Sequence, residues 1–599
     1  MRKFLQSRKP WVESNAFPVF VFLLIGVALY SNTLHSPFVF DDGPSITRNP
    51  TIKNLENFYG NSTGYDKYPT RFIGYLSFAL NYTVGSFDPF GYHIVNLTVH
   101  IINAWLVYFF VLITHRTPFM NKSLPEATAR EISLISGMFF LVHPVQTEAV
   151  TFVVQRLTSL TTTFFLLSIF YYVKARLLFN DRQTNSKYNY LFNFVFSLFF
   201  CVLAMKTKEI SFTLPVVLII YECFFFDGPY RIRAFFLLPF LFTLLIIPLS
   251  LINVRAPIGK VLTDINNVSR VQTDISRGDY FLTQLSVIVT YIRLLFFPIN
   301  QNLDYDYPVY RSLFQPRVFF CATSLLFLLG ISLWLYLRSR RTASAALRGI
   351  SFGIAWFFIT LSVESSLVPI EDVIFEHRIY LPSVGAFVSL AMGAFVISRK
   401  WNRTACILVL VFITVVLSIA TYKRNLIWRN DLVLWSDNVK KSPSKARPHY
   451  NLGSAYLLRG LTDKAILEFR DAIKIDPGYS DAYLNIGVAY ASLGAEEKAM
   501  EALHKAIQLN PSDSESYYNL GLLYSNKGFG HLAIEQYQKS LLLNPESVNA
   551  RNNLGIALAE SGRIDEAIDQ FQAGLKLFPG DEELRKNLER AYELKSHSK

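Results

Sequence analysis

Apolar stretches long enough to cross a bilayer recur throughout the first 421 residues of the chain, separated by short polar segments. Few of these stretches carry a charged side chain, and the pattern predicts an all-α, polytopic bundle of about eleven transmembrane helices. The predicted spans are Phe17–Leu34, His93–Ile113, Ile132–Val142, Leu157–Val173, Tyr190–Leu203, Ile210–Phe226, Ala234–Ile252, Val318–Leu337, Ile350–Leu367, Tyr380–Ile397 and Ala405–Thr421.

Basic residues beside these spans set the expected orientation. The net charge of +13 could indicate nucleic acid, but clusters next to spans are typical of topology signals on the cytoplasmic side. With eleven crossings, and with the polar-interrupted stretch from Tyr280 to Pro298 dipping in or lying flat, the loop after the first span and the C-terminal part lie outside. The expected cytoplasmic marks are Arg2, Lys3, Arg8, Lys9, the loop Lys174–Lys187, Arg231, Arg233, Arg338, Arg340, Arg341, Arg399, Lys400 and Arg403.

Composition agrees with a membrane protein. Hydrophobic residues make up 51% of the 599 residues and charged residues only 17%, which is too apolar for an ordinary soluble chain. The four cysteines, Cys201, Cys223, Cys321 and Cys406, fall within apolar spans. They therefore imply neither a disulfide framework nor a cysteine-based zinc site.

A repeat array follows the bundle. From about Arg447 the chain turns polar, and Asn-Leu-Gly or Asn-Ile-Gly recurs every 34 residues, with proline and alanine at the same period. This spacing predicts four tetratricopeptide repeats over residues 447–599, with Asp581–Leu594 as a cap helix and residues 422–446 as a docking segment after the 1–421 membrane domain. The recurring positions are Asn451, Asn485, Asn519 and Asn553; Pro477, Pro511, Pro545 and Pro579; and Ala465, Ala499, Ala533 and Ala567.

The four repeat asparagines are candidate peptide-binding residues. On the concave face of such an array, Asn451, Asn485, Asn519 and Asn553 would form a ladder of amides that bind a peptide backbone without reading its sequence. The alternative is that asparagine serves local helix packing at this position of the repeat.

Two neighbouring carboxylates, Asp41 and Asp42, follow the first span closely. Aspartate is costly to hold near hydrocarbon, so an acidic pair at this boundary indicates a functional site. A solvated turn through Asp41-Asp42-Gly43-Pro44 is the alternative.

Polar residues in or beside the spans gather at the outer boundary in the expected threading. This one-sided distribution predicts an outward-opening cavity in which a carboxylate takes a proton from an acceptor and cations hold a departing phosphate. For each cation, snorkelling to the lipid headgroups is the alternative. The residues are Asp41, Asp42, Arg71, His93, Asn96, His100, His143, Gln146, Glu148, Arg156, Lys206, Lys208, Glu209, Arg293, Asp304, Asp306, Glu364, Glu376, His377 and Arg378.

The histidines leave a divalent metal open as a cofactor, with His93 and His100, or His143 and Glu148, as ligands. Their spacing matches no standard zinc pattern, so helix-packing histidines are favoured and no metal site is assigned.

Several motifs together resemble the transmembrane and tetratricopeptide-repeat-containing (TMTC-like) O-mannosyltransferase family, in a bacterial-type member. The resemblance covers nearly the whole chain. It implies a GT-C glycosyltransferase fold, a polyprenyl-phosphate-linked sugar as donor, and transfer to Ser or Thr of an exported protein on the non-cytoplasmic side. The motifs are Tyr30–Asp42, Leu80–Tyr82, Gly91–His100, His143–Val150, Lys208-Glu209 and Glu376–Pro382.

Carried over to this chain, the resemblance makes Asp41 or Asp42 the general base and implies an inverting displacement. It makes Arg156, Lys208 and Arg378 candidates for the donor phosphate. The cavity-lining residues would be His93, Asn96, His100, His143, Glu148, Glu209, Glu376 and His377.

Two positions depart from the family pattern. Phe72 follows Arg71 where proline is expected, and Gln146 replaces a frequent histidine, which weakens a metal proposal at that motif.

Two other functions fit the same sequence: a GT-C enzyme that glycosylates a lipid or glycan, and a non-enzymatic membrane scaffold whose repeats recruit proteins. The phenylalanine-rich spans and the motif spellings favour a bacterial inner membrane with periplasmic repeats over an endoplasmic reticulum membrane with luminal repeats.

The threading predicts that the C-terminus lies outside the cytoplasm. A periplasmic alkaline phosphatase fused after Lys599 should be active, and the same enzyme fused after Arg341, at a cytoplasmic mark, should be inactive. An inactive fusion at the C-terminus, with a fluorescent cytoplasmic reporter active there instead, would contradict the predicted orientation.

Overall fold

The computed structural model describes residues 16–180, 187–251, 273, 275–366 and 368–597, whose regular structure is helical and contains no strand. The chain divides into two compact units, Met1–Asn430 and Asp431–Lys599. The expected cytoplasmic marks Arg2, Lys3, Arg8 and Lys9, part of the loop Lys174–Lys187, and the span ends Ile252 and Leu367 lie outside the described residues.

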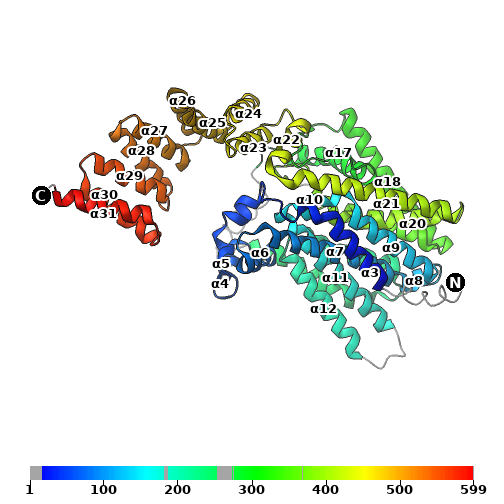
Figure 1. Ribbon diagram of the computed structural model, residues 1–599. Helices are drawn as coiled ribbons and strands as arrows, with labels where there is room; N and C mark the ends of the chain where they lie inside the picture. Colours follow the sequence, from blue (N-terminus) through cyan, green and yellow to red (C-terminus); the bar gives the residue numbers. More distant parts are fainter. Residues whose placement is uncertain (1–15, 181–186, 252–272, 274, 367, 598–599) are drawn as a thin grey trace, which may run out of the picture. The chain divides into compact units, whose positions relative to one another are not determined.

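Unit 1 is a bundle of long helices joined by short ones (Figure 1). Its α-helices are α3 (Ala16–Tyr30), α4 (Glu56–Tyr59), α5 (Thr63–Lys67), α6 (Phe72–Gly85), α7 (Pro89–His115), α8 (Pro118–Asn121), α9 (Glu126–Val142), α10 (Thr147–Thr151), α11 (Arg156–Asn180), α12 (Lys187–Met205), α13 (Leu214–Phe225), α14 (Tyr230–Thr243), α15 (Ile246–Leu251), α17 (Arg277–Phe296), α18 (Pro316–Thr342), α19 (Ala345–Leu361), α20 (Tyr380–Ser398) and α21 (Arg403–Asn425). Shorter turns are η1 (Ser31–Thr33), η2 (Gly43–Thr47), η3 (Pro50–Lys53), η4 (Pro144–Gln146), η5 (Val153–Gln155), η6 (Glu209–Thr213), η7 (Glu376–Ile379) and η8 (Leu426–Arg429).

In the described part of unit 1, eight helical segments are long and apolar enough to cross a membrane, and α12 and α19 are shorter apolar helices. The eight are Ala16–Thr33, Pro89–His115, Val153–Asn180, Tyr230–Leu251, Arg277–Phe296, Pro316–Thr342, Glu376–Ser398 and Arg403–Arg429. The predicted spans at Ile132–Val142 and Ile210–Phe226 lie on α9 and α13, which pack within the same bundle. An all-α fold with a helical membrane part is therefore confirmed.

Helix α17 covers the polar-interrupted stretch and is continuous over 20 residues. Near its start the Tyr280 hydroxyl donates to the Glu364 carbonyl, and at its end the Leu295 carbonyl lies 3.1 Å from His143 Nε2. Helix α17 is long and apolar enough to cross a membrane. Whether it crosses, dips in or lies flat stays a prediction.

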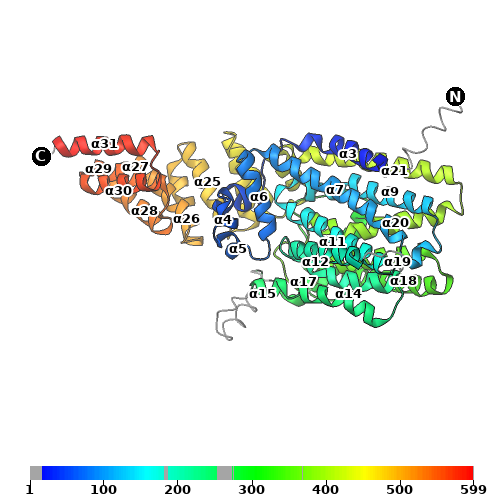
Figure 2. The ribbon, with the colours of Figure 1, turned by 90° about the horizontal axis from the view of Figure 1, so that it is seen from below.

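The core of unit 1 is aromatic and tightly packed. Helices α7, α9 and α20 run side by side in both views (Figures 1 and 2). The rings of Phe110, Phe352 and Trp356 meet with centroids 5.5 to 6.4 Å apart, and all three side chains are buried. Edge and offset ring contacts at such distances add to the stabilisation that burial provides.

Unit 2 is a stack of helix pairs preceded by α22 (Asp431–Lys441). The pairs are α23 (Ala446–Leu457) with α24 (Thr462–Ile475), α25 (Ser480–Ser492) with α26 (Glu496–Leu509), α27 (Ser514–Asn526) with α28 (Gly530–Leu543), and α29 (Val548–Glu560) with α30 (Ile564–Leu577). Helix α31 (Glu582–His597) packs against α30, as expected of a cap.

The glycine of each Asn-Leu/Ile-Gly motif explains the close packing within a pair. A Cβ atom added at Gly453 would stand 2.7 Å from the ring of Phe469, and one at Gly555 would stand 2.5 Å from the ring of Phe571. The same contact therefore recurs every 34 residues: glycine, which has no side chain, leaves room for a large side chain on the partner helix.

The boundary between the units lies inside the predicted docking segment 422–446. Helix α21 continues past Thr421 to Asn425, and α22 packs on α23 as the first helix of unit 2. The helix does not end where the apolar run ends. Its last polar residues, Arg424 and Asn425, are buried against the rest of unit 1.

Helices α19 and α20 approach most closely at two glycines, Gly353 and Gly385. A Cβ atom at Gly353 would lie 2.2 Å from the Gly385 carbonyl oxygen, a backbone atom that cannot move aside. We expect Gly353→Ala to lower the free energy of unfolding by about 1–3 kcal/mol, because the helices must separate. Thermal unfolding of the purified protein measures the effect.

The matched control is Gly393→Ala on α20, where an added Cβ meets nothing within 4 Å. Equal melting temperatures for the two variants would contradict the close helix approach.

Candidate active site

The loop that follows α3 is held by the side chain of Asp42, which is fully buried. Its Oδ2 accepts the N–H of Val39 at 3.0 Å, and its Oδ1 accepts the N–H of Val154 at 2.7 Å. The second bond joins the loop to η5, directly before α11 begins at Arg156. Asp42 therefore connects two segments that are more than a hundred residues apart in the sequence.

Burial also changes the acidity of this carboxyl. Removal from water raises the pKa of Asp42 to about 7, and the neighbouring charge of Asp41 adds to the rise, while the backbone N–H donors oppose it. A group with this pKa exchanges its proton near neutral pH.

Asp41 differs from its neighbour in exposure, since its side chain is only partly buried. The residue before it, Phe40, has a left-handed φ of +49°, a conformation that costs a non-glycine residue about 1–3 kcal/mol. The ring of Phe40 lies 6.2 Å from the ring of Phe152. Asp41 is thus the more exposed member of the acid pair.

Three cations that the sequence places far apart come together on the same side of unit 1. Arg71, Lys208 and Arg378 all act electrostatically on His377. Each of these cations is held by hydrogen bonds or ion pairs within the protein, and the partner groups differ from one cation to the next.

Arg71 forms a two-pronged ion pair with Glu209. Nε lies 3.0 Å from Oε1 and Nη2 lies 3.1 Å from Oε2, and the Thr70 hydroxyl also donates to Oε1. Burial raises the pKa of Glu209, but the charge and hydrogen bonds of Arg71 outweigh it and hold the pKa at about 2. This pair is charged at every physiological pH.

Lys208 and Arg378 are supported differently. Lys208 Nζ lies 2.8 Å from Glu364 Oε1 and donates to the Thr158 hydroxyl at 2.9 Å. Arg378 donates to the backbone carbonyls of Val373 and Asp372 at 3.1 and 2.6 Å. These carbonyls orient the guanidinium, and the carboxylates of Glu364 and Asp372 also act on its charge.

The His143–Val150 and Glu376–Pro382 motifs meet through carboxylates. Glu148 Oε1 lies 2.6 Å from His377 Nδ1, and Glu148 Oε2 accepts the N–H of Glu376. Burial raises the pKa of Glu148 above its usual range, and the charge of Glu376 adds to the rise. The two motifs thus form one polar network although more than 220 residues separate them.

Sequence reasoning named Asp304 and Asp306 in the loop that completes this network but missed its other polar residues. The buried carboxylate of Glu376 accepts from Gln301 Nε2, the Asn302 N–H and the Tyr305 hydroxyl at 2.6 to 2.8 Å. The signal was the polar run Asn300-Gln301-Asn302 shortly before Asp304, which a search for acids and bases alone does not register.

The side chain of Arg156 takes part in contacts between helices. Its Nε donates to Asn96 Oδ1 at 2.6 Å, and its terminal nitrogens donate to the carbonyls of Ser77 and Tyr92. The side chain is fully buried, with the guanidinium 4.8 Å from the centre of the Phe78 ring. These contacts occupy every nitrogen of the guanidinium.

Of the four predicted histidines of the bundle, the three besides His377 also contact protein groups. His100 lies between the Tyr380 hydroxyl and the Leu141 carbonyl, and His93 Nε2 lies 2.9 Å from the Ser36 carbonyl. His143 Nδ1 accepts the Val145 N–H. Such contacts are those expected of helix-packing histidines.

In unit 2 the repeat asparagines bridge neighbouring repeats. Asn485 Nδ2 donates to the hydroxyl of Tyr450, and Asn553 Nδ2 donates to that of Tyr518, both at 3.1 Å. Asn519 Nδ2 donates to the Glu515 carbonyl within its own helix. Part of the amide ladder is thus engaged in packing, and peptide binding by Asn451, Asn485, Asn519 and Asn553 stays a prediction.

Family models match the repeats. A model described as tetratricopeptide repeat matches residues 518–582, and one described as TPR repeat matches residues 453–494 and 490–528.

Curated relatives match a larger part of the chain. It is 26% identical over 480 residues to the protein O-mannosyl-transferase F38B6.6 of Caenorhabditis elegans, covering 74% of this chain and 61% of that protein. It is 25% identical over 520 residues to Tmtc3 of Drosophila melanogaster (75% and 54%) and 25% identical over 506 residues to TMTC4 of Homo sapiens (74% and 64%), both named protein O-mannosyl-transferases. The chain spans less than two thirds of the length of each.

A solved structure described as the crystal structure of MamA is 29% identical, covers 24% of this chain and 85% of that one, and has a TM-score of 0.23. Over about three quarters of its length the chain is similar in sequence to proteins named O-mannosyl-transferases, and family models match tetratricopeptide repeats in unit 2.

The buried bonds of Asp42 predict a loss of stability in Asp42→Asn. An amide offers one acceptor where two backbone N–H groups need acceptors, so we expect the free energy of unfolding to fall by about 1–3 kcal/mol. The folded-state pKa of about 7 lies above the ordinary carboxyl value of about 3.9, so the wild-type contribution is fully present below about pH 4 and is lost as pH rises through 7.

Melting temperatures between pH 4 and 8 measure both effects. The control is Asp66→Asn, at an exposed aspartate in the same outer segment. If Asp42→Asn melted like this control, with the wild-type slope against pH, Asp42 would not hold the loop.

Proposed function

We propose that this chain is an integral-membrane glycosyltransferase that moves a sugar from a polyprenyl-phosphate donor to Ser or Thr of exported proteins. The observation that carries the proposal is the start of α11. Val154 holds the acid pair there through Asp42, and Thr158, about one helical turn further on, accepts from Lys208. The start of α11 thus holds both the loop of the proposed base and the proposed phosphate-binding cation. The likeness to protein O-mannosyl-transferases agrees with that chemistry.

Asp41 is the proposed general base. Its carboxylate takes the proton of the acceptor hydroxyl while the hydroxyl oxygen attacks the anomeric carbon and the bond from that carbon to the phosphate oxygen breaks. The lipid phosphate leaves with the electron pair, and a single displacement inverts the anomeric configuration. Asp42 orders the loop and, with a pKa of about 7, also holds a proton near the base.

Lys208 and Arg378 are the residues best placed to receive the phosphate. Arg378 is oriented by carbonyls, so its charge can stabilise a developing phosphate anion. Lys208 would exchange its contact with Glu364 for a phosphate oxygen. Arg156 would act at longer range, because its donors bind Asn96, Ser77 and Tyr92.

The proposed sidedness follows the threading. Both the acid pair and the repeats face the non-cytoplasmic compartment, and the repeats hold the acceptor polypeptide before transfer. In a bacterial cell this compartment is the periplasm, and in a eukaryotic cell it is the lumen of the endoplasmic reticulum.

Asp41→Asn should reduce transfer by about 10²- to 10⁴-fold without lowering the melting temperature, because it removes the base and leaves the bonds of Asp42 in place. The assay incubates the purified full-length protein with labelled polyprenyl-phosphate sugars and a panel of exported Ser/Thr peptides, and measures the label transferred. Glu56→Gln, at an exposed acid of the same outer segment, is the control and should keep wild-type activity.

Transfer by Asp41→Asn at the wild-type rate would refute the assigned base. Absence of transfer with every donor would favour a scaffold whose repeats recruit proteins. Labelling of a lipid or glycan acceptor instead of the peptides would favour a GT-C enzyme that glycosylates a lipid or glycan.

A further inference from the structure

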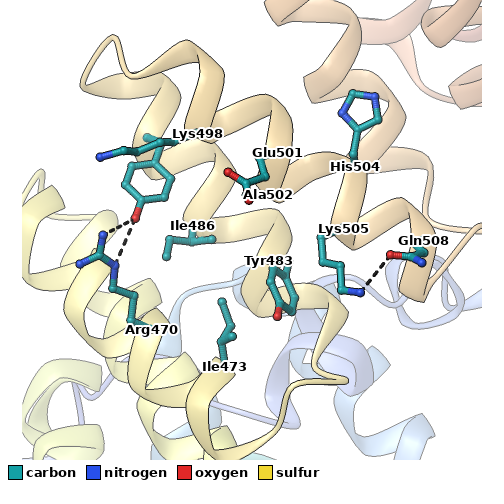
Figure 3. A pocket seen from close by; sticks show the side chains of 11 residues that line it. Arg470, Ile473, Tyr483, Ile486, Lys498, Glu501, Ala502, His504, Lys505 and Gln508 are labelled. Carbon is teal, nitrogen blue, oxygen red and sulfur yellow. Dashed lines mark hydrogen bonds between the residues drawn. The ribbon is translucent and has the colours of Figure 1, made fainter.

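Unit 2 contains a groove of about 800 Å³ on a part of the array that the asparagine ladder does not line (Figure 3). Its walls come from three consecutive helices, α24, α25 and α26. Along α26 the lining residues Lys498, Glu501, Ala502 and Lys505 follow helical spacing, so a single face of that helix borders the groove.

The rim of the groove is basic. Arg470, Lys498 and Lys505 line it, Glu501 is the one acid among the lining residues, and His504 adds an imidazole. Such an excess of positive charge attracts carboxylates and disfavours basic ligands.

The wall supplied by α25 is aromatic and apolar. Tyr483, Ile486 and Tyr490 recur at i, i+3 and i+7 and face the groove. The Tyr490 hydroxyl accepts from Nε and Nη2 of Arg470 at 3.2 and 2.8 Å, which fixes the guanidinium at the edge (Figure 3). Among the described contacts this leaves Nη1 able to meet a carboxylate.

The basic residues are not a requirement of the repeat. At the equivalent positions two repeats later, 68 residues on, the chain has Gln538, Glu566 and Ala573 in place of Arg470, Lys498 and Lys505. Those positions lie in helices α28 and α30, which pack as the earlier pairs do. Helix packing therefore does not explain why this one groove is basic.

We infer that the groove binds an acidic polypeptide segment, with carboxylates at Arg470, Lys498 and Lys505 and an apolar or aromatic side chain against Tyr483 and Ile486. The site is separate from the asparagine ladder. It does not depend on the proposed transfer reaction, because binding here uses no residue of unit 1.

The test measures binding of a fluorescent peptide rich in Asp, Glu and Phe to the full-length protein in detergent, by anisotropy at low and moderate salt. The groove variant combines Arg470→Gln, Lys498→Glu and Lys505→Ala, each of which introduces the residue found two repeats later, so folding should be kept. We expect at least a tenfold weaker affinity in this variant, and weaker binding of the wild type at higher salt.

The control variant makes the same change in charge elsewhere, at the exposed residues Lys576→Glu, Lys586→Ala and Arg590→Gln on α30 and α31. It should bind the acidic peptide within about twofold of wild type, and circular dichroism should show equal helix content in all three proteins. The same peptide with Asn and Gln in place of Asp and Glu should bind at least tenfold more weakly than the acidic one.

Equal binding of the acidic and amide peptides, or equal affinity in the groove and control variants, would overturn the inference. So would a concentration-dependent dimer that the groove variant alone abolishes, since the occupant would then be a second copy of the chain. Loss of peptide binding in the groove variant, with its transfer to short unstructured acceptors unchanged, would support the groove as an independent site. If the wild type transfers no sugar but still binds the acidic peptide and the groove variant does not, the proposed enzyme is refuted and the groove is supported.

Discussion

Unit 1 depends on one constraint: a polar group that it buries is stabilised by hydrogen-bond partners within the protein, because hydrocarbon offers none. The start of α11 meets this constraint several times within a few residues. The N–H of Val154 is satisfied by Asp42, the guanidinium of Arg156 by three oxygens, and Thr158 accepts from Lys208. One short segment therefore orders the first loop, the helix α7 and Lys208 together.

The same constraint is met differently at another buried ion pair. Arg176 and Glu222 form an almost fully buried pair, and the Tyr172 hydroxyl also donates to Glu222, so charge is matched by opposite charge. Around His377, in contrast, the guanidinium of Arg378 donates to two backbone carbonyls, and the carboxylates of Glu364 and Asp372 act on it electrostatically. A directly matched pair stabilises an arrangement, whereas a cation oriented by carbonyls can also act on an incoming anion. This contrast is the physical reason for assigning chemistry to the second region.

In each repeat of unit 2, some positions pack against the partner helix and others lie at the surface. Small residues such as Gly453 and Gly555 face large rings on the partner helix, and those positions cannot vary without a clash. The residues that border the groove, such as Lys498 and Lys505, vary along the array because they carry no packing role. A regular scaffold can in this way hold a binding surface that occurs at one place only.

The sequence by itself determined what depends on local pattern. Hydropathy over some twenty residues sets a membrane helix, and a 34-residue period sets a repeat, so the helical membrane part, the repeats and the cap were predicted from residues alone. The gathering of Lys208, Glu148 and Arg378 on one side also followed, because topology signals order the ends of helices.

Tertiary structure alone decided how those residues divide their roles. The difference between a buried Asp42 and an accessible Asp41, the engagement of Arg156 in packing, and the bonds from Gln301 to Glu376 depend on contacts between distant segments. Hydropathy and spacing carry no information about such pairings, because they are decided only when the helices pack and each buried group takes the nearest available partner.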